Sequence, residues 1–144
     1  MESRHCYWIV VALLACVAAT SCRRDAPVAK PEARIIWRAV GSWSGHGNRQ
    51  TESFTSDTGA LRVRWEAKPI AGAAGDATFR LNAHSAVSGR ILQPVVDVRG
   101  PGSGVDYVSQ DPHVFYMSVE STGLEWTFSV DEGIAGQTIG ESSR

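Results

Sequence analysis

The chain has no cysteine beyond residue 22, because Cys6, Cys16 and Cys22 are the three cysteines of its 144 residues. This absence excludes a disulfide and a cysteine metal site from the region that follows. That region also lacks the 3.6-residue apolar period of an amphipathic helix. A core of apolar side chains from β-strands must therefore provide its stability.

The motifs of several chemistries are missing as well. No G-x-S-x-G elbow occurs, the carboxylates are scattered over turns and outward strand positions, and no acidic loop of the EF-hand type is present. The histidines His46, His84 and His113 do not have the spacing of a helical metal site. The formal net charge of −1 argues against general attraction to nucleic acid. We therefore predict no catalytic residues, no metal, no cofactor and no nucleic-acid partner.

The first 22 residues have the pattern of an export signal. Arg4 and His5 precede an uninterrupted apolar run from Cys6 to Thr20. A membrane-spanning helix needs roughly 20 apolar residues, and this run is shorter, so a retained transmembrane helix is the weaker interpretation. We predict that residues 1–22 direct export.

Two stretches of this segment end in cysteine, LLAC at 13–16 and ATSC at 19–22. Each resembles the bacterial lipobox, and this resemblance implies a diacylglyceryl thioether on the cysteine that becomes the new N-terminus. Cys22 is favoured by the longer apolar run before it and the charges after it, whereas Cys16 has the better-placed leucine. Acyl chains at about 0.8 kcal/mol per buried methylene would hold the protein on a membrane. An ordinary secretory signal cleaved after Ala19 is the remaining alternative.

Residues 23–33 carry two prolines and mixed charges, and we interpret them as a flexible tether. Residues 34–132 form the predicted domain, and residues 133–144 lack periodicity and are predicted to be a disordered tail.

Within the domain, apolar and polar residues alternate with the period of a half-buried strand, as in LRVRWEA at 61–67. The same pattern predicts strands near residues 34–41, 50–55, 78–84, 93–99, 104–109, 114–120 and 125–131. Turn residues separate them. These features predict an all-β fold, an antiparallel sandwich of about eight strands with a jelly-roll or C2-like topology.

The inward phase of these strands defines the expected core, in which aromatic rings carry much of the buried area. Its members are Trp37, Phe54, Leu61, Val63, Trp65, Phe79, Leu81, Val96, Val98, Phe115, Met117, Trp126, Phe128 and Val130.

The stretches W-x-G-x-G at 43–47, T-E-x-F at 51–54, V-R-W-E at 63–66 and GLEWTFSVDE at 123–132 form a wider pattern. Together they resemble small secreted or lipid-anchored β-sandwich domains of bacteria whose function is unknown. The resemblance covers residues 40–132. It implies export and a sandwich fold, and it brings no catalytic residues.

One candidate binding site is a stripe of outward side chains. If the strands at 61–67 and 77–84 are neighbours, Arg62, Arg64, Arg80 and His84 share one face. The guanidinium group of arginine can donate two parallel hydrogen bonds to a carboxylate or phosphate, so such a face would suit anionic lipid headgroups or an acidic partner. A solvated surface is the competing interpretation.

A second candidate is Trp43, which could stack on a sugar together with Tyr107 and Tyr116, or could cap the edge of the core. Gly45 and Gly47 predict a turn that carries His46.

These observations predict an exported, lipid-anchored, non-catalytic binding or structural module of the bacterial cell envelope, whose partner is an unknown envelope protein or glycan. A secreted or periplasmic location is the alternative to anchoring. A small envelope hydrolase with a metal or carboxylate site on the loops is the alternative function.

Overall fold

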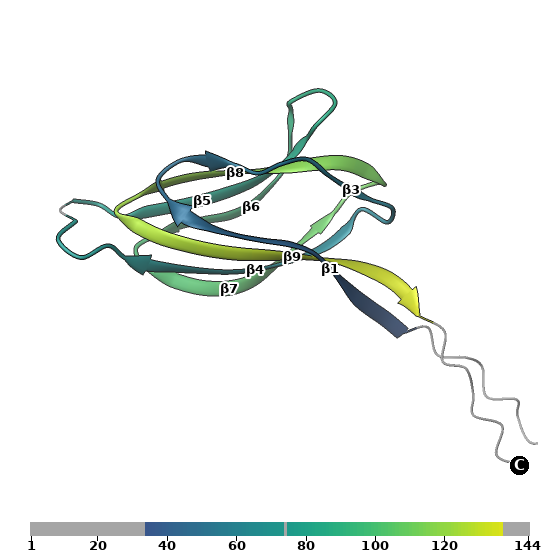
Figure 1. The fold of residues 1–144 in the computed structure, drawn as a ribbon, viewed down its shortest axis with the longest axis horizontal. Helices are drawn as coiled ribbons and strands as arrows, with labels where there is room; N and C mark the ends of the chain where they lie inside the picture. The colour runs from purple at the N-terminus through teal and green to yellow at the C-terminus, as the bar shows by residue number, and fades with distance from the viewer. Residues whose placement is uncertain (1–33, 74, 137–144) are drawn as a thin grey trace, which may run out of the picture. The chain divides into compact units, whose positions relative to one another are not determined.

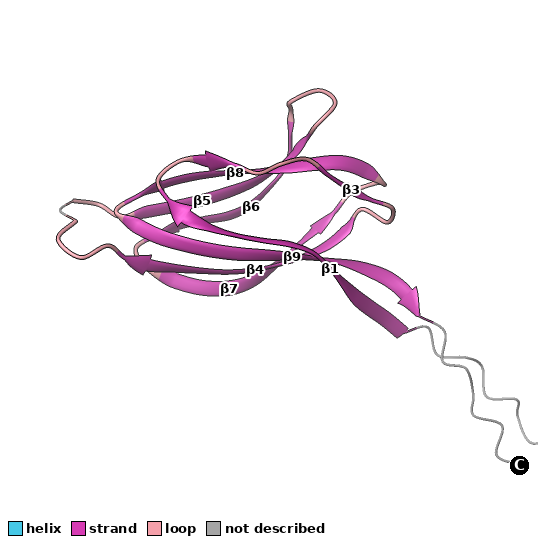
Figure 2. Cartoon of the chain, viewed as in Figure 1, coloured by secondary structure: helices cyan, strands magenta, loops and turns pink. Residues whose placement is uncertain are grey.

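The computed structural model describes residues 34–73 and 75–136, and within them every helix or strand is a β-strand (Figure 2). The strands are β1 (Arg34–His46), β2 (Arg49–Gln50), β3 (Phe54–Ser56), β4 (Ala60–Pro69), β5 (Thr78–Ser85), β6 (Ile91–Arg99), β7 (Gly102–Ser109), β8 (His113–Thr122) and β9 (Leu124–Gly136).

Two antiparallel sheets pack face to face (Figure 1). Sheet A has the order β1-β9-β4-β7, and sheet B has the order β2-β8-β5-β6, with β3 also paired to β8. The all-β antiparallel sandwich predicted from the sequence is confirmed. The described part of the chain has nine strands and not eight, because the strand expected at 50–55 is divided into β2 and β3.

The pairing pattern distinguishes the two predicted topologies. The first strand pairs with the last, β2 and β3 pair with β8, β4 pairs with β7, and β5 pairs with β6. A ribbon of antiparallel pairs wrapped across two sheets in this way is a jelly roll.

The core lies between the sheets, as the alternation predicts. Sheet A contributes side chains from β4, β7 and β9, and sheet B contributes side chains from β5, β6 and β8. The buried apolar residues are Leu61, Val63, Ala67, Phe79, Leu81, Ala83, Val96, Val108, Phe115, Met117, Val119, Leu124, Trp126, Phe128 and Val130. Phe54, Trp65 and Val98 are partly buried against this cluster.

Trp37 is not part of this core, and its prediction as a core residue was wrong. The register of β1 against β9 shifts between Ala39 and Gly41, so β1 has one extra residue there. Such a bulge reverses the alternation of side chains along the strand, so residues an even number apart on its two sides face opposite sides of the sheet. Trp43 therefore points into the sandwich opposite Phe128, whereas Trp37 lies on the outer face of sheet A.

Both ends of β1 differ from the prediction. β1 continues through Gly45 to His46, and only Gly47, with φ 66°, makes the turn toward β2. Gly45 pairs with Trp126 within the strand, and the absence of a side chain there leaves room for the Trp126 ring, from which an added Cβ would lie only 3.1 Å away.

At its other end, β1 pairs with the last residues of β9, which extends to Gly136 beyond the predicted domain limit at residue 132. The pairing of β4 with β9 reaches only as far as Glu132, so residues 34–37 and 133–136 form a two-stranded ribbon that continues past β4 (Figure 1). We call this segment the β1–β9 ribbon.

Glu132 is a fully buried carboxylate that connects three elements. It accepts hydrogen bonds from Ser56 Oγ at 2.7 Å and from the backbone amides of Asp57 and Thr58 at 2.6 and 3.0 Å, and it pairs with Arg38. Burial alone would raise its pKa, but these hydrogen bonds outweigh burial and lower the pKa to about 2. Glu132 thereby holds the β3–β4 turn against β1 and β9.

The export signal at 1–22, the tether at 23–33 and the candidate lipidation sites Cys22 and Cys16 lie outside the described residues, as does the predicted tail from residue 137. Among the residues described, no helix is long and apolar enough to cross a membrane.

Candidate functional site

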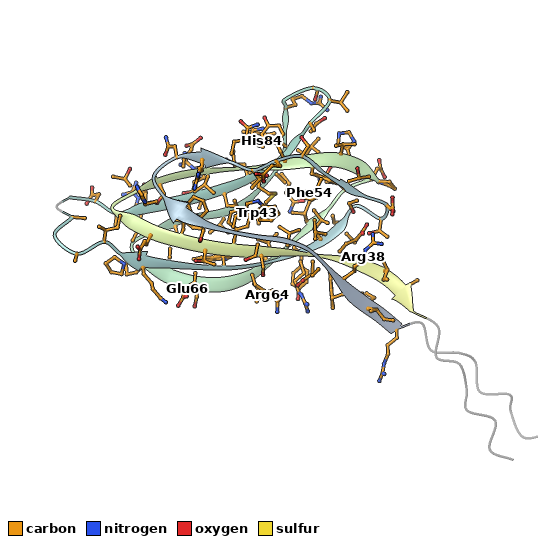
Figure 3. All side chains as sticks on the ribbon, in the orientation of Figure 1. Arg38, Trp43, Phe54, Arg64, Glu66 and His84 are labelled. Atoms are coloured by element: carbon orange, nitrogen blue, oxygen red, sulfur yellow. The ribbon has the colours of Figure 1, made fainter. Side chains whose placement is uncertain are left out.

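The four residues of the predicted stripe do not share one face. Arg62 and Arg64 lie on β4 in sheet A, whereas Arg80 and His84 lie on β5 in sheet B. The chain crosses between the sheets after Pro69, so the assumed pairing of the two strands was wrong. Figure 3 shows Arg64 on one outer side of the sandwich and His84 on the opposite side. The prediction is correct only within each pair.

On the outer face of sheet B, Arg80 is neutralised by its neighbours. Its guanidinium lies 3.2 Å from Asp97 and 3.2 Å from Glu120 on the two flanking strands. One cation therefore meets two carboxylates, and all three side chains are about half-exposed or more. We therefore interpret this part of sheet B as a solvated surface with a local excess of negative charge.

His84 makes the contacts of an oriented histidine on the same face. Its Nε2 lies 2.8 Å from Ser118 Oγ, and its Nδ1 lies 3.1 Å from both the Gly89 carbonyl oxygen and the Tyr116 hydroxyl. Donation from Nδ1–H to Gly89 would leave Nε2 as the acceptor for the Ser118 hydroxyl.

That serine lacks the other parts of a nucleophilic site. Serine chemistry also needs N–H donors around the developing oxyanion. Ser118 lies in the middle of β8, where Gln50 of β2 and Asn82 of β5 pair with it on the two sides. The backbone amide of the preceding residue, Met117, donates to Thr51 Oγ1 at 2.9 Å, and we interpret the contact of Ser118 with His84 as a structural hydrogen bond.

Trp43 closes the edge between the sheets. Its ring lies 5.2 Å from that of Phe128 and 6.1 Å from that of Phe54, between the two layers (Figure 3). Its Nε1 donates to Glu52 Oε2 at 3.2 Å. A hydrogen bond from the backbone amide of Glu52 and, second, this bond from Trp43 lower the pKa of that carboxyl. Trp43 and Trp126 also line a depression of about 190 Å³. This geometry supports the capping role of Trp43 over a sugar-stacking role.

The outer face of sheet A carries an aromatic and cationic group that the sequence did not reveal. The guanidinium carbon of Arg62 lies 4.5 Å from the centroid of the Trp37 ring, and the rings of Trp37 and Tyr107 are 6.0 Å apart. Arg62 and Tyr107 are direct partners across β4 and β7. Trp37 of β1 pairs with Gly133 of β9, and its ring extends across this glycine toward Arg62 and Tyr107. A Cβ added at Gly133 would lie 3.1 Å from the Trp37 ring.

Among the residues that the structure describes, Asp131 is the one carboxylate that pairs with Arg62 and Arg64. The Nη2 atoms of Arg62 and Arg64 both lie 2.9 Å from its Oδ2. Asp131 is buried, whereas Arg64 is half-exposed, so Arg64 keeps N–H donors that face solvent. Two cations thus meet one carboxylate on this face, the reverse of the arrangement around Arg80.

Exposed apolar side chains border the same group. Ile35 is 65% exposed, Val105 is 50% exposed and Tyr107 is 58% exposed. Val105 pairs with Arg64 across β7 and β4, and Ile35 lies two residues before Trp37 on β1. We call the surface formed by Ile35, Trp37, Arg62, Arg64, Val105 and Tyr107 the aromatic–arginine face.

The three histidines are separated. His46 is exposed at the end of β1 opposite Glu125, and His113 Nε2 lies 2.7 Å from Ser85 Oγ. In the part of the chain that the structure describes, no group of three or more histidine, cysteine, aspartate or glutamate residues could hold a metal ion.

A scan of protein-family models and searches of curated proteins and of solved structures found no match to this chain. The resemblance to small bacterial lipoproteins therefore stays a prediction, and the aromatic–arginine face is the candidate site that the structure itself supplies.

Proposed function

We propose that the protein is an exported, lipid-anchored, non-catalytic β-sandwich module of the bacterial cell envelope that binds through its aromatic–arginine face. Cys22 is the proposed lipidation site, with Cys16 as the alternative. The observation that carries the binding role is the placement of Trp37, Arg62 and Tyr107 on an outer sheet face. Large aromatic rings normally enter the core of so small a domain.

The chemistry of the face suits recognition better than turnover. Arg64 offers planar donors to an anion, and the aromatic rings offer apolar surface at little conformational cost. Arg62 is held by both Asp131 and Trp37, so this part of the face is ordered before any ligand arrives. Such preorganisation reduces the entropy lost on binding.

Mass spectrometry of the mature N-terminus tests the anchor. We expect a diacylglyceryl-modified Cys22 in the membrane fraction, and a Cys22→Ser variant that loses the modification and leaves that fraction. An unmodified mature chain that starts at Thr20 or Ser21 would overturn the anchoring and leave a secreted or periplasmic protein.

In-cell photo-crosslinking tests the binding face. A photoreactive phenylalanine at position 107 should form adducts with an envelope component. The matched control is the same group at Val87, which is 81% exposed on the β5–β6 loop of sheet B. Adducts from position 87 alone, or from neither position, would contradict the assignment of the face.

The Ser118–His84 contact is the observation that would suit a serine hydrolase, a different class from the metal- or carboxylate-based hydrolase that the sequence leaves as the alternative. A fluorophosphonate probe labels an activated serine. We expect no labelling of the purified chain, and labelling that disappears in Ser118→Ala would contradict the non-catalytic role.

A further inference from the structure

We propose that the aromatic–arginine face docks on the surface of an anionic lipid bilayer and so fixes the orientation of the sandwich on its membrane. This inference rests on the proposed function for its setting, since the lipid anchor would supply the membrane. The residues that make the contact come from the neighbouring strands β4 and β7 and from the β1–β9 ribbon.

The apolar part of the face has the composition of a membrane interface. Trp37 and Tyr107 are the residue types that concentrate where headgroups meet acyl chains, because each ring combines an apolar body with a polar edge. Ile35 and Val105 are both at least half-exposed beside them, and neither has a packing role in the core. Two aliphatic and two aromatic side chains could thus enter the headgroup region together.

The charge on the face matches an anionic surface only at the end near the ribbon. There Arg62 and Arg64 share one carboxylate, and Arg64 is half-exposed. At the opposite end of the same face, Glu66 and Glu125 line a depression with Lys68, so carboxylates predominate there. The distribution of charge on the outer face of sheet A therefore favours a contact with the bilayer through the end near the β1–β9 ribbon. The end that carries Glu66 and Glu125 would be held away from the bilayer.

The position of the aromatic–arginine face in the chain also supports a contact with the bilayer. Residues 23–33 separate the proposed lipid site Cys22 from Arg34, and a fully extended chain of that length reaches at most about 40 Å. Ile35 is the second residue of β1, so the face begins where the proposed tether ends. An anchored domain has a high effective concentration at the bilayer, and a weak contact then suffices.

A second copy of the chain fits the face less well. In an isologous dimer each patch meets its own copy, so the paired arginines of one protomer would approach those of the other. The single buried Asp131 of each copy is already engaged. Phosphate groups offer those arginines a partner of opposite charge.

Flotation with vesicles tests the proposal. The chain from residue 22 onward, carrying Cys22→Ser so that no lipid is attached, is mixed with vesicles of 30% phosphatidylglycerol in phosphatidylcholine. We expect it to float with these vesicles and not with pure phosphatidylcholine. Raising the salt from 50 to 500 mM should weaken the binding at least threefold, because salt screens exposed charges.

Matched variants locate the contact. Ile35→Ser combined with Tyr107→Ser should weaken vesicle binding at least tenfold, while Val87→Ser combined with Ile91→Ser, which removes similarly exposed apolar groups near the end of sheet B, should leave it unchanged. Arg64→Gln should weaken binding about threefold, and Arg80→Gln should not. Circular dichroism checks that each variant is folded.

Three results would overturn the proposal: equal binding to neutral and anionic vesicles, equal losses from the two double variants, or no vesicle binding at 50 mM salt. A dimer in light scattering that dissociates in Tyr107→Ser would assign the face to a second copy. Failure of the anchor is a separate result, because it appears in the mass of the mature N-terminus and leaves the vesicle measurement intact.

Discussion

On the outer face of sheet B one arginine, Arg80, lies between two carboxylates, whereas on the outer face of sheet A one carboxylate, Asp131, lies between two arginines. The same residue types thus give one face a local excess of negative charge and the other an excess of positive charge. The chain as a whole is close to neutral, with a formal net charge of −1. A near-neutral protein can therefore still present a cationic surface, and strand topology decides where it lies.

The largest expected effect concerns the core beneath the faces. Trp126→Ala removes a buried ring from β9 and should lower the free energy of unfolding by about 3–5 kcal/mol, because it leaves a cavity. Trp37→Ala on the outer face should cost only about 1 kcal/mol. Urea unfolding measures both. Equal losses would show that Trp37 supports the core and would break the distinction between core and face.

The second prediction concerns Glu132, which follows Asp131 in β9, and the dependence of stability on pH. The pKa of Glu132 in the folded protein is about 2, below its ordinary value of 4.5, so its contribution to stability is complete above pH 4.5 and is lost as the pH falls toward 2. We expect a loss on the order of 2 kcal/mol, reduced from the full shift because Arg38 is half-exposed and screened.

The Glu132→Gln variant is the reference for this measurement. It should be less stable than the unaltered chain at pH 7 and should approach it in stability as the pH falls from 4.5 to 2. A difference in the free energy of unfolding between Glu132→Gln and the unaltered chain that is the same at every pH would contradict the role of Glu132.

The third prediction tests the charge comparison directly. Asp131→Asn removes the shared carboxylate and should lower the free energy of unfolding by about 1–2 kcal/mol, since hydrogen bonds to charged groups are lost. The same change frees positive charge and should strengthen binding to anionic vesicles. The matched change on sheet B, Asp97→Asn, removes an exposed partner and should cost less than 1 kcal/mol. A loss of both stability and vesicle binding in Asp131→Asn would argue that the arginines act only structurally.

The smallest effect concerns the position of Trp37. Gly133→Ala places a methyl group 3.1 Å from that ring and should displace it, at a cost of about 1 kcal/mol or less. Tryptophan emission should change, and vesicle binding should fall. Gly102→Ala is the control, because its methyl group would meet Trp65 at 3.5 Å, an ordinary contact. No change of emission in Gly133→Ala would show that Trp37 is not confined by β9.

Alternation of apolar and polar residues predicted the strands and most of the core, because burial between two sheets imposes a period of two. The predicted core did not include the buried residues Ala67, Ala83, Val108, Val119 and Leu124. It failed at Trp37 because Trp37 and Trp43, six residues apart, have the same parity, and a one-residue bulge between them reverses the faces. Only the pairing of β1 with β9 reveals that bulge.

The candidate site was less predictable than the fold. Arg62 and Arg64 were identified as outward-facing, but their neighbours come from β1, β7 and β9, which are distant in sequence. Which strands are adjacent depends on crossings between the sheets, and local alternation contains no information about these. For the same reason the sequence did not show that Glu132 would be buried.

The pairing of β1 with β9 also constrains when the protein can fold. Of the strands that the structure describes, β1 is synthesised first, yet it pairs with β9, which is synthesised last, and β2 and β3 must likewise wait for β8. Contacts between such distant segments form slowly, because a long loop must close before any contact is gained. Sheet A therefore cannot be completed on a growing chain. The two strands that begin and end the sandwich can therefore form their shared edge only after β9 has been synthesised.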